Sequence, residues 1–271
     1  MKPNEILEHS IKVGKVKASS KAGRLVVLGI LAGAFIALAA VGANTAGSNL
    51  LLDVNTFGIG KLVTGFVFTV GLMLVVLAGG ELFTGNCLMI TSVLDKEIKI
   101  KDMLRNWVIV YIANFVGAVL VAFLIYESGD LNGGMVGAIT VKIAASKVSL
   151  SFVQAFILGI FCNFLVCLAV WIAFGADTTT GKIFGMFFPI LLFVTSGFEH
   201  SIANMYYIPA GLFAKANEGF VAASGATSEA LNNLTWGGFL ANNLLPVTIG
   251  NIVGGAIFVG MAYWYSYKKA K

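Results

Sequence analysis

The chain has 271 residues, of which 58% are hydrophobic and only 11% are charged, and its formal net charge is +5. Soluble domains carry roughly 25% charged residues, so this composition excludes a single soluble core, a disordered chain and a coiled coil. The three cysteines, an odd number placed in apolar stretches, also argue against a disulfide framework. The composition favours an all-α integral membrane protein.

The N-terminal segment, residues 1–24, is polar, and the spacing of its lysines predicts an amphipathic helix that lies on the membrane surface. Six apolar stretches follow, each long enough to cross a bilayer, because a straight span needs roughly 20 residues. They form one transmembrane domain, residues 25–265, and residues 266–271 form a short C-terminal tail. In chain order the predicted spans are Leu25–Ala43, Leu62–Ile90, Trp107–Tyr126, Phe152–Phe174, Ile183–Ala210 and Phe239–Tyr263.

The distribution of lysine and arginine predicts how the chain is oriented in the membrane. Most of the 18 such residues fall on the side that holds both termini and the loops after the second and fourth spans. The positive-inside rule therefore predicts a multi-pass protein of the cytoplasmic (inner) cell membrane with both termini in the cytoplasm. The charge excess reflects topology, so we expect membrane lipid and not nucleic acid as a partner. The exceptions, on the outer side, are Lys61, Lys142, Lys147 and Lys215.

The two halves of the chain, about residues 25–126 and 152–263, repeat the same short patterns in the same order. Three spans per repeat is an odd number, so the second copy must enter the membrane upside down, as in many transporters and channels. This predicts six transmembrane helices arranged as a 3+3 inverted repeat. The matched patterns are Gly29-Ile30 with Gly159-Ile160, Gly79-x-Glu81-x4-Asn86 with Gly197-x-Glu199-x4-Asn204, and Asn114-x2-Gly117 with Asn251-x2-Gly254.

The second and fifth spans are too long for one simple helix, and each has charge inside it. Irregular backbone at membrane depth is tolerated only where protein or a water-filled cavity satisfies its polar groups. We therefore predict that both spans are broken at equivalent positions and that a pore or binding site lies between the two breaks.

Glu81, Glu199 and His200 are the ionisable residues within the spans, and such residues are costly and usually functional. His200 can change charge near physiological pH, so we interpret it as a pore residue. The alternative is a histidine that only hydrogen-bonds to the backbone at a break. The two glutamates recur at symmetric positions. We expect them, with Asn86 and Asn204, to hold the broken helices together by accepting hydrogen bonds from freed backbone N–H groups.

Other candidate residues have both structural and functional interpretations. Lys147 lies on the outside, where lysines commonly snorkel, and the sequence does not separate it from Lys142. Asn163 either links helices or points its amide at an anion or at His200. Phe68 and Leu72, four residues apart, share one helix face and in most proteins only pack. The sequence shows no acid/base pair, phosphate loop, metal cluster or cofactor motif, so we predict no enzyme, no metal site and no cofactor.

From Leu25 to Tyr267 the sequence resembles the formate/nitrite transporter family. The resemblance implies an aquaporin-like protomer of six helices, assembled as a homo-pentamer with one pore per protomer, that passes formate, nitrite or hydrosulfide. It rests on four blocks in the right order: Gly79–Gly85 (GGELFTG), Gly159–Ala169 (GIFCNFLVCLA), Phe198–Met205 (FEHSIANM) and Pro246–Asn251 (PVTIGN).

The resemblance also implies roles for individual residues. His200 is the expected central pore histidine, Thr84 lines the pore beside it, and Asn163 and Lys147 help to attract or hold the anion. Four apolar side chains are expected to form constrictions around the central chamber: Phe68, Leu72, Leu82 and Phe193.

The sequence thus predicts a membrane channel for small monovalent anions. The alternatives are an aquaporin-type channel for neutral solutes, although paired Asn-Pro-Ala motifs are absent, and a membrane scaffold without transport activity. From the direction of each span we expect Phe68 and Leu72 on the outer side of His200, and Phe193 on the inner side. We expect Leu82 near the centre, towards the inner gate.

Overall fold

The computed structural model describes residues 1–268, and within this range every regular element is helical and none is a strand. Six stretches of helix are long and apolar enough to cross a bilayer, which confirms the predicted number of spans. The first, third and sixth are longer than the predicted apolar runs, because flanking residues continue the helices, and the second and fifth are shorter, because each stops at a break. The six stretches are Ala22–Leu52, Phe57–Gly79, Ile100–Glu127, Phe152–Gly175, Thr179–Ser196 and Gly238–Tyr267.

The chain divides into two halves of similar element order. The first half contains α1 (Pro3–Ala18), α2 (Ala22–Leu52), α3 (Phe57–Phe68), α4 (Val70–Met73), the π-helix η1 (Leu74–Gly79), α5 (Phe83–Asn86), the 3-10 helix η2 (Cys87–Met89), α6 (Ile90–Leu94) and α7 (Ile100–Glu127). The second contains the 3-10 helix η3 (Asp130–Asn132), α8 (Val136–Val148), α9 (Phe152–Gly175), α10 (Thr179–Ser196), α11 (Ser201–Ala214), α12 (Glu218–Ser224), α13 (Ser228–Asn233), the π-helix η4 (Gly238–Leu244), α14 (Leu245–Ile252), the π-helix η5 (Val253–Met261) and α15 (Ala262–Tyr267).

Both overlong spans are broken where the sequence predicts. The second span stops being helical after η1, runs extended through Gly80 and Leu82, and resumes at α5. The fifth span stops after α10 and resumes at α11. Each helical stretch ends on a glycine with positive φ, +98° at Gly79 and +78° at Gly197, a conformation that other residues rarely adopt. The breaks are therefore equivalent, as the repeat requires.

The two repeats also pack in the same way. In the first, α2 lies against α7 and α3, and in the second, α9 lies against α14 and α10. The contacts between these helices depend on small residues. A Cβ at Gly117 would overlap the carbonyl oxygen of Ile30, and a Cβ at Gly254 would overlap that of Ile160. Only glycine allows the two backbones to approach this closely.

The N-terminal helix α1, predicted as an amphipathic helix, is part of this folded unit. Its apolar face, which includes the buried residues Ile6, Leu7 and Ile11, packs against α6, α9 and η2. Its counterpart in the second half is α8, which precedes α9 as α1 precedes α2. The structural repeat is therefore longer at its N-terminal side than the predicted residues 25–126.

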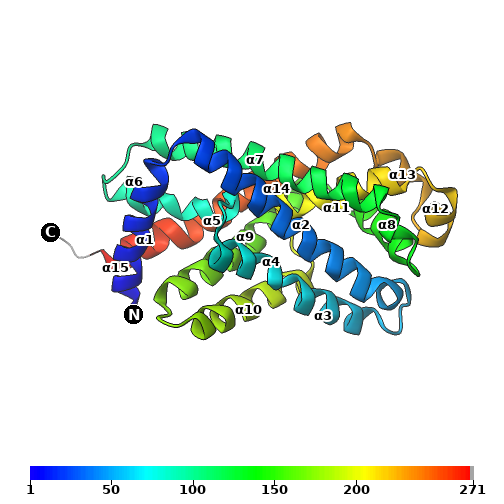
Figure 1. The fold of residues 1–271 in the computed structure, drawn as a ribbon, viewed down its shortest axis with the longest axis horizontal. Coiled ribbons are helices and arrows are strands. Elements are labelled where there is room, and N and C mark those ends of the chain that lie inside the picture. The colour runs from blue at the N-terminus through cyan, green and yellow to red at the C-terminus, as the bar shows by residue number, and fades with distance from the viewer. Residues whose placement is uncertain (269–271) are drawn as a thin grey trace.

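Residue Met1 and the last described residue, Lys268, lie at the same end of the molecule, which we call the terminal end (Figure 1). The opposite end carries α8, α12 and α13, and we call it the far end (Figure 1). An even number of spans requires both termini to lie on the same side, as they do here. Of the predicted C-terminal tail, residues 269–271 lie outside the described residues.

Candidate functional site

Asn114 of α7 satisfies the backbone polar groups that the first break sets free. Its side-chain oxygen accepts a hydrogen bond from the N–H of Phe83 (3.0 Å), the first residue of α5. Its amide nitrogen donates to the carbonyls of Gly29 (2.7 Å) and Glu81 (2.8 Å). This one buried side chain therefore joins α2, α7 and both sides of the break. Without it, the backbone polar groups at the break would lack hydrogen-bond partners within the membrane.

Asn251 of α14 does the same for the second break. Its oxygen accepts from the N–H of Ser201 (2.9 Å), and its nitrogen donates to the carbonyls of Gly159 (2.8 Å) and Glu199 (2.9 Å). The repeated asparagine was visible in the sequence as part of a matched pattern, but nothing in the pattern indicated that it holds the break.

We had expected the two glutamates to accept hydrogen bonds from backbone N–H groups. Instead, the donors to both glutamates are other side chains. Glu199 accepts hydrogen bonds from Lys147 (2.7 Å), Asn204 (2.7 Å) and Asn243 (3.0 Å). The side chains of Lys147 and Glu199 are only 15% and 5% exposed. A charge pair this deeply buried is stable only if its remaining lone pairs are hydrogen-bonded, and the two asparagines supply those bonds.

Glu81 has the equivalent surroundings at the first break. It pairs with Lys17 of α1 (2.8 Å) and accepts from Asn86 (2.7 Å), whose amide also donates to Asn106 (2.8 Å). Lys17 is therefore the counterpart of Lys147, and its ammonium points into the bundle. The sequence gives no sign of this role, because Lys17 is one of several lysines spaced along residues 1–24.

His200 lies directly after the second break and contacts the first through Thr84. Its side chain is 3% exposed. Its Nδ1 accepts a hydrogen bond from the N–H of Ala203 (3.0 Å), so the proton of the neutral ring is on Nε2, which donates to the Thr84 hydroxyl (2.9 Å). The backbone at the start of α11 thus fixes the tautomer.

Asn163 does not reach the histidine. Its amide nitrogen donates to the carbonyls of Thr84 (3.2 Å) and Asn251 (2.7 Å), and its side chain is fully buried outside both cavities described below. Both of its N–H donors are therefore used by the backbone. The expectation that Asn163 holds an anion is corrected: it links the middle of α9 to the segments that carry Thr84 and Asn251.

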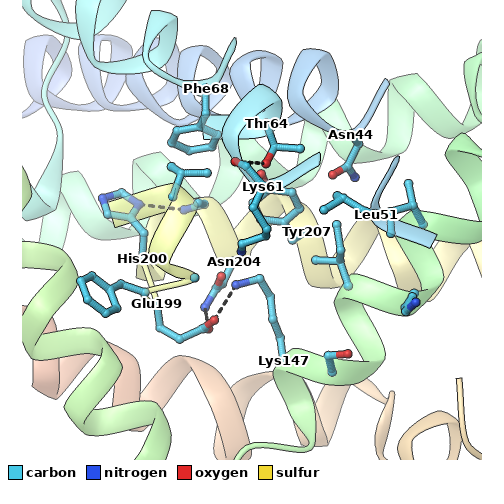
Figure 2. A pocket seen from close by; sticks show the side chains of 18 of the residues that line it. Asn44, Leu51, Lys61, Thr64, Phe68, Lys147, Glu199, His200, Asn204 and Tyr207 are labelled. Atoms are coloured by element: carbon cyan, nitrogen blue, oxygen red, sulfur yellow. Dashed lines mark hydrogen bonds and ion pairs between the residues drawn. The ribbon is translucent and has the colours of Figure 1, made fainter. Parts of the chain in front are cut away.

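A cavity of about 260 Å³ opens between His200 and the far end, and we call it the far cavity (Figure 2). Lys147 lines it, as expected, together with Lys61, Lys142 and Tyr207. A second cavity of about 190 Å³, the terminal cavity, lies on the other side of the breaks and is lined by Lys17. The two cavities approach the His200–Thr84 pair from opposite sides.

The four apolar residues divide between these cavities in a way that we had not predicted. Phe68 and Phe193 both line the far cavity and contact each other edge to face, with ring centroids 5.8 Å apart. Leu72 and Leu82 both line the terminal cavity. All four side chains are buried, so they separate the two cavities. The expectation that Phe193 lies on the opposite side from Phe68 is wrong, as is the expectation that Leu72 accompanies Phe68.

The reason is the length of α10. Its 18 residues rise about 27 Å at 1.5 Å per residue, nearly the thickness of the hydrocarbon core. α10 packs along α3, and its C-terminal end lies beside the start of α3, where the Thr195 hydroxyl donates to the Lys61 carbonyl. Phe193, close to that end of α10, therefore lies with Phe68 at the far cavity. Phe68 and Leu72 are one helical turn apart, and they face different cavities. The path between the two cavities is therefore narrow at this turn.

Comparison with known proteins shows to which family a chain with this arrangement belongs. A family model described as formate/nitrite transporter matches residues 4–265. The chain belongs to the formate/nitrite transporter family. Members of this family span the membrane several times and are transport proteins, not enzymes, and the same holds for this chain.

Individual members of the formate/nitrite transporter family agree over nearly the whole length. A probable formate transporter of Methanothermobacter thermautotrophicus is 45% identical over 95% of this chain and 93% of its own. The formate channel BtFdhC of Bacillus thuringiensis is 42% identical over 99% and 96%. A solved structure, a pentameric formate channel with formate bound, has a TM-score of 0.80 at 40% identity and covers 92% of this chain and 98% of its own.

Proposed function

We propose that this chain is a channel or facilitator for small monovalent anions of weak acids, with one pore per protomer that passes between the two cavities and beside His200. The observation that carries the proposal is the buried His200–Thr84 pair: His200 lines the far cavity, and the terminal cavity lies on the other side of the pair, beyond the apolar side chains of Leu72 and Leu82. Formate is the first candidate substrate because similar proteins are named as formate channels; nitrite and hydrosulfide are the others.

The central barrier follows from the chemistry of the constrictions. A bare anion that passes Phe68 and Phe193 loses its water, which costs far more than the loss of water by a neutral solute. His200 Nε2 donates to the Thr84 oxygen, so the hydroxyl proton of Thr84 is free to donate to an anion. A hydrogen bond from Thr84, or a proton shared with His200, offsets part of the lost hydration.

The assembly and orientation that we propose complete this account. The protomers form a homo-pentamer, which the likeness to a pentameric formate channel supports. The terminal end faces the cytoplasm of the inner membrane, which the distribution of lysine and arginine supports. Native mass spectrometry of the detergent-extracted protein tests the assembly: five copies are expected, and a monomer or dimer would contradict the proposal.

Solute flux into proteoliposomes tests the function directly. Formate, nitrite and hydrosulfide should enter faster than chloride or acetate. All three should also enter these proteoliposomes faster than they enter vesicles without protein. Glycerol and water are the matched neutral solutes, and they should show no protein-dependent flux. A protein that passes glycerol but none of the anions would instead be a neutral-solute channel, and a protein that passes nothing would be a scaffold.

A further inference from the structure

Lys61 is one of three lysines that line the far cavity, together with Lys142 and Lys147. It belongs to α3, where Lys61, Thr64 and Phe68 are spaced i, i+3 and i+7, so they share one helix face, and all three line the cavity. The same face continues one turn further to Leu72 in the terminal cavity. Lys61 therefore begins a line of side chains that follows the path from the far end through the constriction.

The backbone around Lys61 is fixed. Its carbonyl oxygen accepts hydrogen bonds from the hydroxyls of Thr64 (2.9 Å) and Thr195 (3.5 Å), which tie α3 to the end of α10. Its ammonium lies against Gly197: a Cβ added there would be 3.2 Å from the Lys61 Nζ. Gly197 ends α10 three residues before His200, so the charge of Lys61 is held beside the second break.

The other two lysines of the far cavity differ from Lys61 in their ion-pair partner or in their position. Lys147 forms an ion pair with Glu199 (2.7 Å), so the two together contribute no net charge to the cavity. Among residues 1–268, Lys61 forms no ion pair, and its ammonium donates no hydrogen bond. Figure 2 shows its side chain pointing into the cavity towards Asn204. Lys142, which also lacks an ion pair in that range, comes from α8 and not from the face that leads to Phe68.

We propose that Lys61, and not Lys147, is the residue that binds the anion in the far cavity, directly before the Phe68–Phe193 constriction. This inference rests on the proposed anion-channel function and adds a specific residue to it. An ammonium without a carboxylate partner attracts an anion in a partly enclosed cavity more strongly than a neutralised pair does. Small carboxylates and oxyanions fit the site, because a cavity of about 260 Å³ leaves room for the ion and several waters.

The test removes the charge of Lys61 and then restores it chemically. In proteoliposomes, initial formate influx is measured against formate concentration for Lys61→Cys and, as the matched control from the same cavity, Lys142→Cys. The native thiols at Cys87, Cys162 and Cys167 are buried and should not interfere. Each variant is treated with methanethiosulfonate reagents of similar size that attach an ammonium, a neutral hydroxyl or a sulfonate group.

The expected result is that Lys61→Cys raises the half-saturating formate concentration about fivefold at low ionic strength, with less change in the maximal rate. The ammonium reagent should restore the value, the neutral reagent should not, and the sulfonate should raise it further. The difference should shrink as an impermeant salt is added. Lys142→Cys should stay within about twofold of the parent under every treatment, because Lys142 comes from α8 and not from the α3 face that leads to Phe68.

Three results would overturn the inference while leaving the channel function intact: equal effects at both positions, rescue by the neutral reagent, or a change in maximal rate alone. An untreated parent protein without formate flux above that of empty vesicles would instead overturn the proposed function, and the inference with it.

Discussion

The ion pair of Lys147 and Glu199 holds the second break, and this structural role can be separated from attraction of anions. Replacing Lys147 with Met leaves the Glu199 carboxylate buried without its countercharge, which costs about 3–5 kcal/mol of stability. We expect a large loss of thermal stability in detergent and of formate flux. The double variant Lys147→Met with Glu199→Gln removes both charges and should recover much of the stability.

Lys142→Met is the matched control, because Lys142 lines the same cavity without an ion pair among residues 1–268, and it should change neither quantity much. If the double variant is no more stable than Lys147→Met, the pair does not hold the break.

At the scale of single residues, the sequence indicates the site where a residue is chemically conspicuous. His200, Glu81 and Glu199 stand out as ionisable groups in apolar spans, and the structure brings all three to the breaks. Asn163 has the same depth and polarity, but its amide donates to two carbonyls, and no pattern in the sequence shows which acceptors are near. Lys61 looked like an ordinary outer lysine, because a missing ion pair is visible only when the neighbours are known.

At the scale of helices, close packing through glycine should determine whether the repeats fold. Gly117→Ala and Gly254→Ala place a methyl group where a carbonyl oxygen of the neighbouring helix lies, and we expect each to lower the melting temperature in detergent. Because the two positions are related by the repeat, their effects should be similar.

Gly58→Ala is the control for these variants, since nothing lies within 4 Å of an added Cβ in α3 at that position. It should leave the melting temperature unchanged or raise it slightly, as alanine favours helix. Equal melting temperatures for all three variants would show that the helix contacts are less close than described.

The docking of α1 should depend on pH through His9. This ring contacts Phe174 edge to face at 5.0 Å, and burial, together with Lys182 and Lys12, lowers the pKa of His9 below its ordinary value of 6.5. Protonation of His9 therefore opposes docking: its contribution is present above about pH 6.5 and is lost as the pH falls below that value. Hydrogen exchange in Pro3–Ala18 should accelerate between pH 7 and pH 5 relative to α7, after correction for the intrinsic rate.

His9→Gln is the matched variant, because glutamine is similar in size and does not titrate. Its corrected exchange in α1 should be the same at both pH values. A parent protein whose α1 exchange does not respond to pH, or a variant that responds equally, would assign the pH dependence to another group.

The sequence predicts the helices better than the contacts between them. The number of spans, the two breaks and the repeat all follow from apolar length and matched patterns, and the structure confirms them. Which residues lie beside the end of a helix depends on where that helix stops and on what it packs against, and apolar runs define neither closely. That uncertainty placed Phe193 on the wrong side of His200.

At the scale of the whole molecule, two half-repeats of opposite direction give one path with related cavities at its two ends. Each break has a lysine, a glutamate and asparagines, from Lys17 and Glu81 at the terminal end to Lys147 and Glu199 at the far end. The histidine has no counterpart, because the position equivalent to His200 is Leu82. The two ends therefore have similar charged frames, and the histidine belongs to the second break alone.

Initial formate influx into proteoliposomes, measured from pH 5 to pH 8 at a fixed concentration of the formate anion, tests the central role of His200 most directly. Because His200 is proposed to share a proton with the passing anion, the rate of the parent protein should change across this range. His200→Asn should still assemble, because the asparagine oxygen can take the place of Nδ1 and accept from the Ala203 N–H, but its rate should be nearly independent of pH. Parallel profiles for the two proteins would contradict the account and reduce His200 to a structural residue at the break.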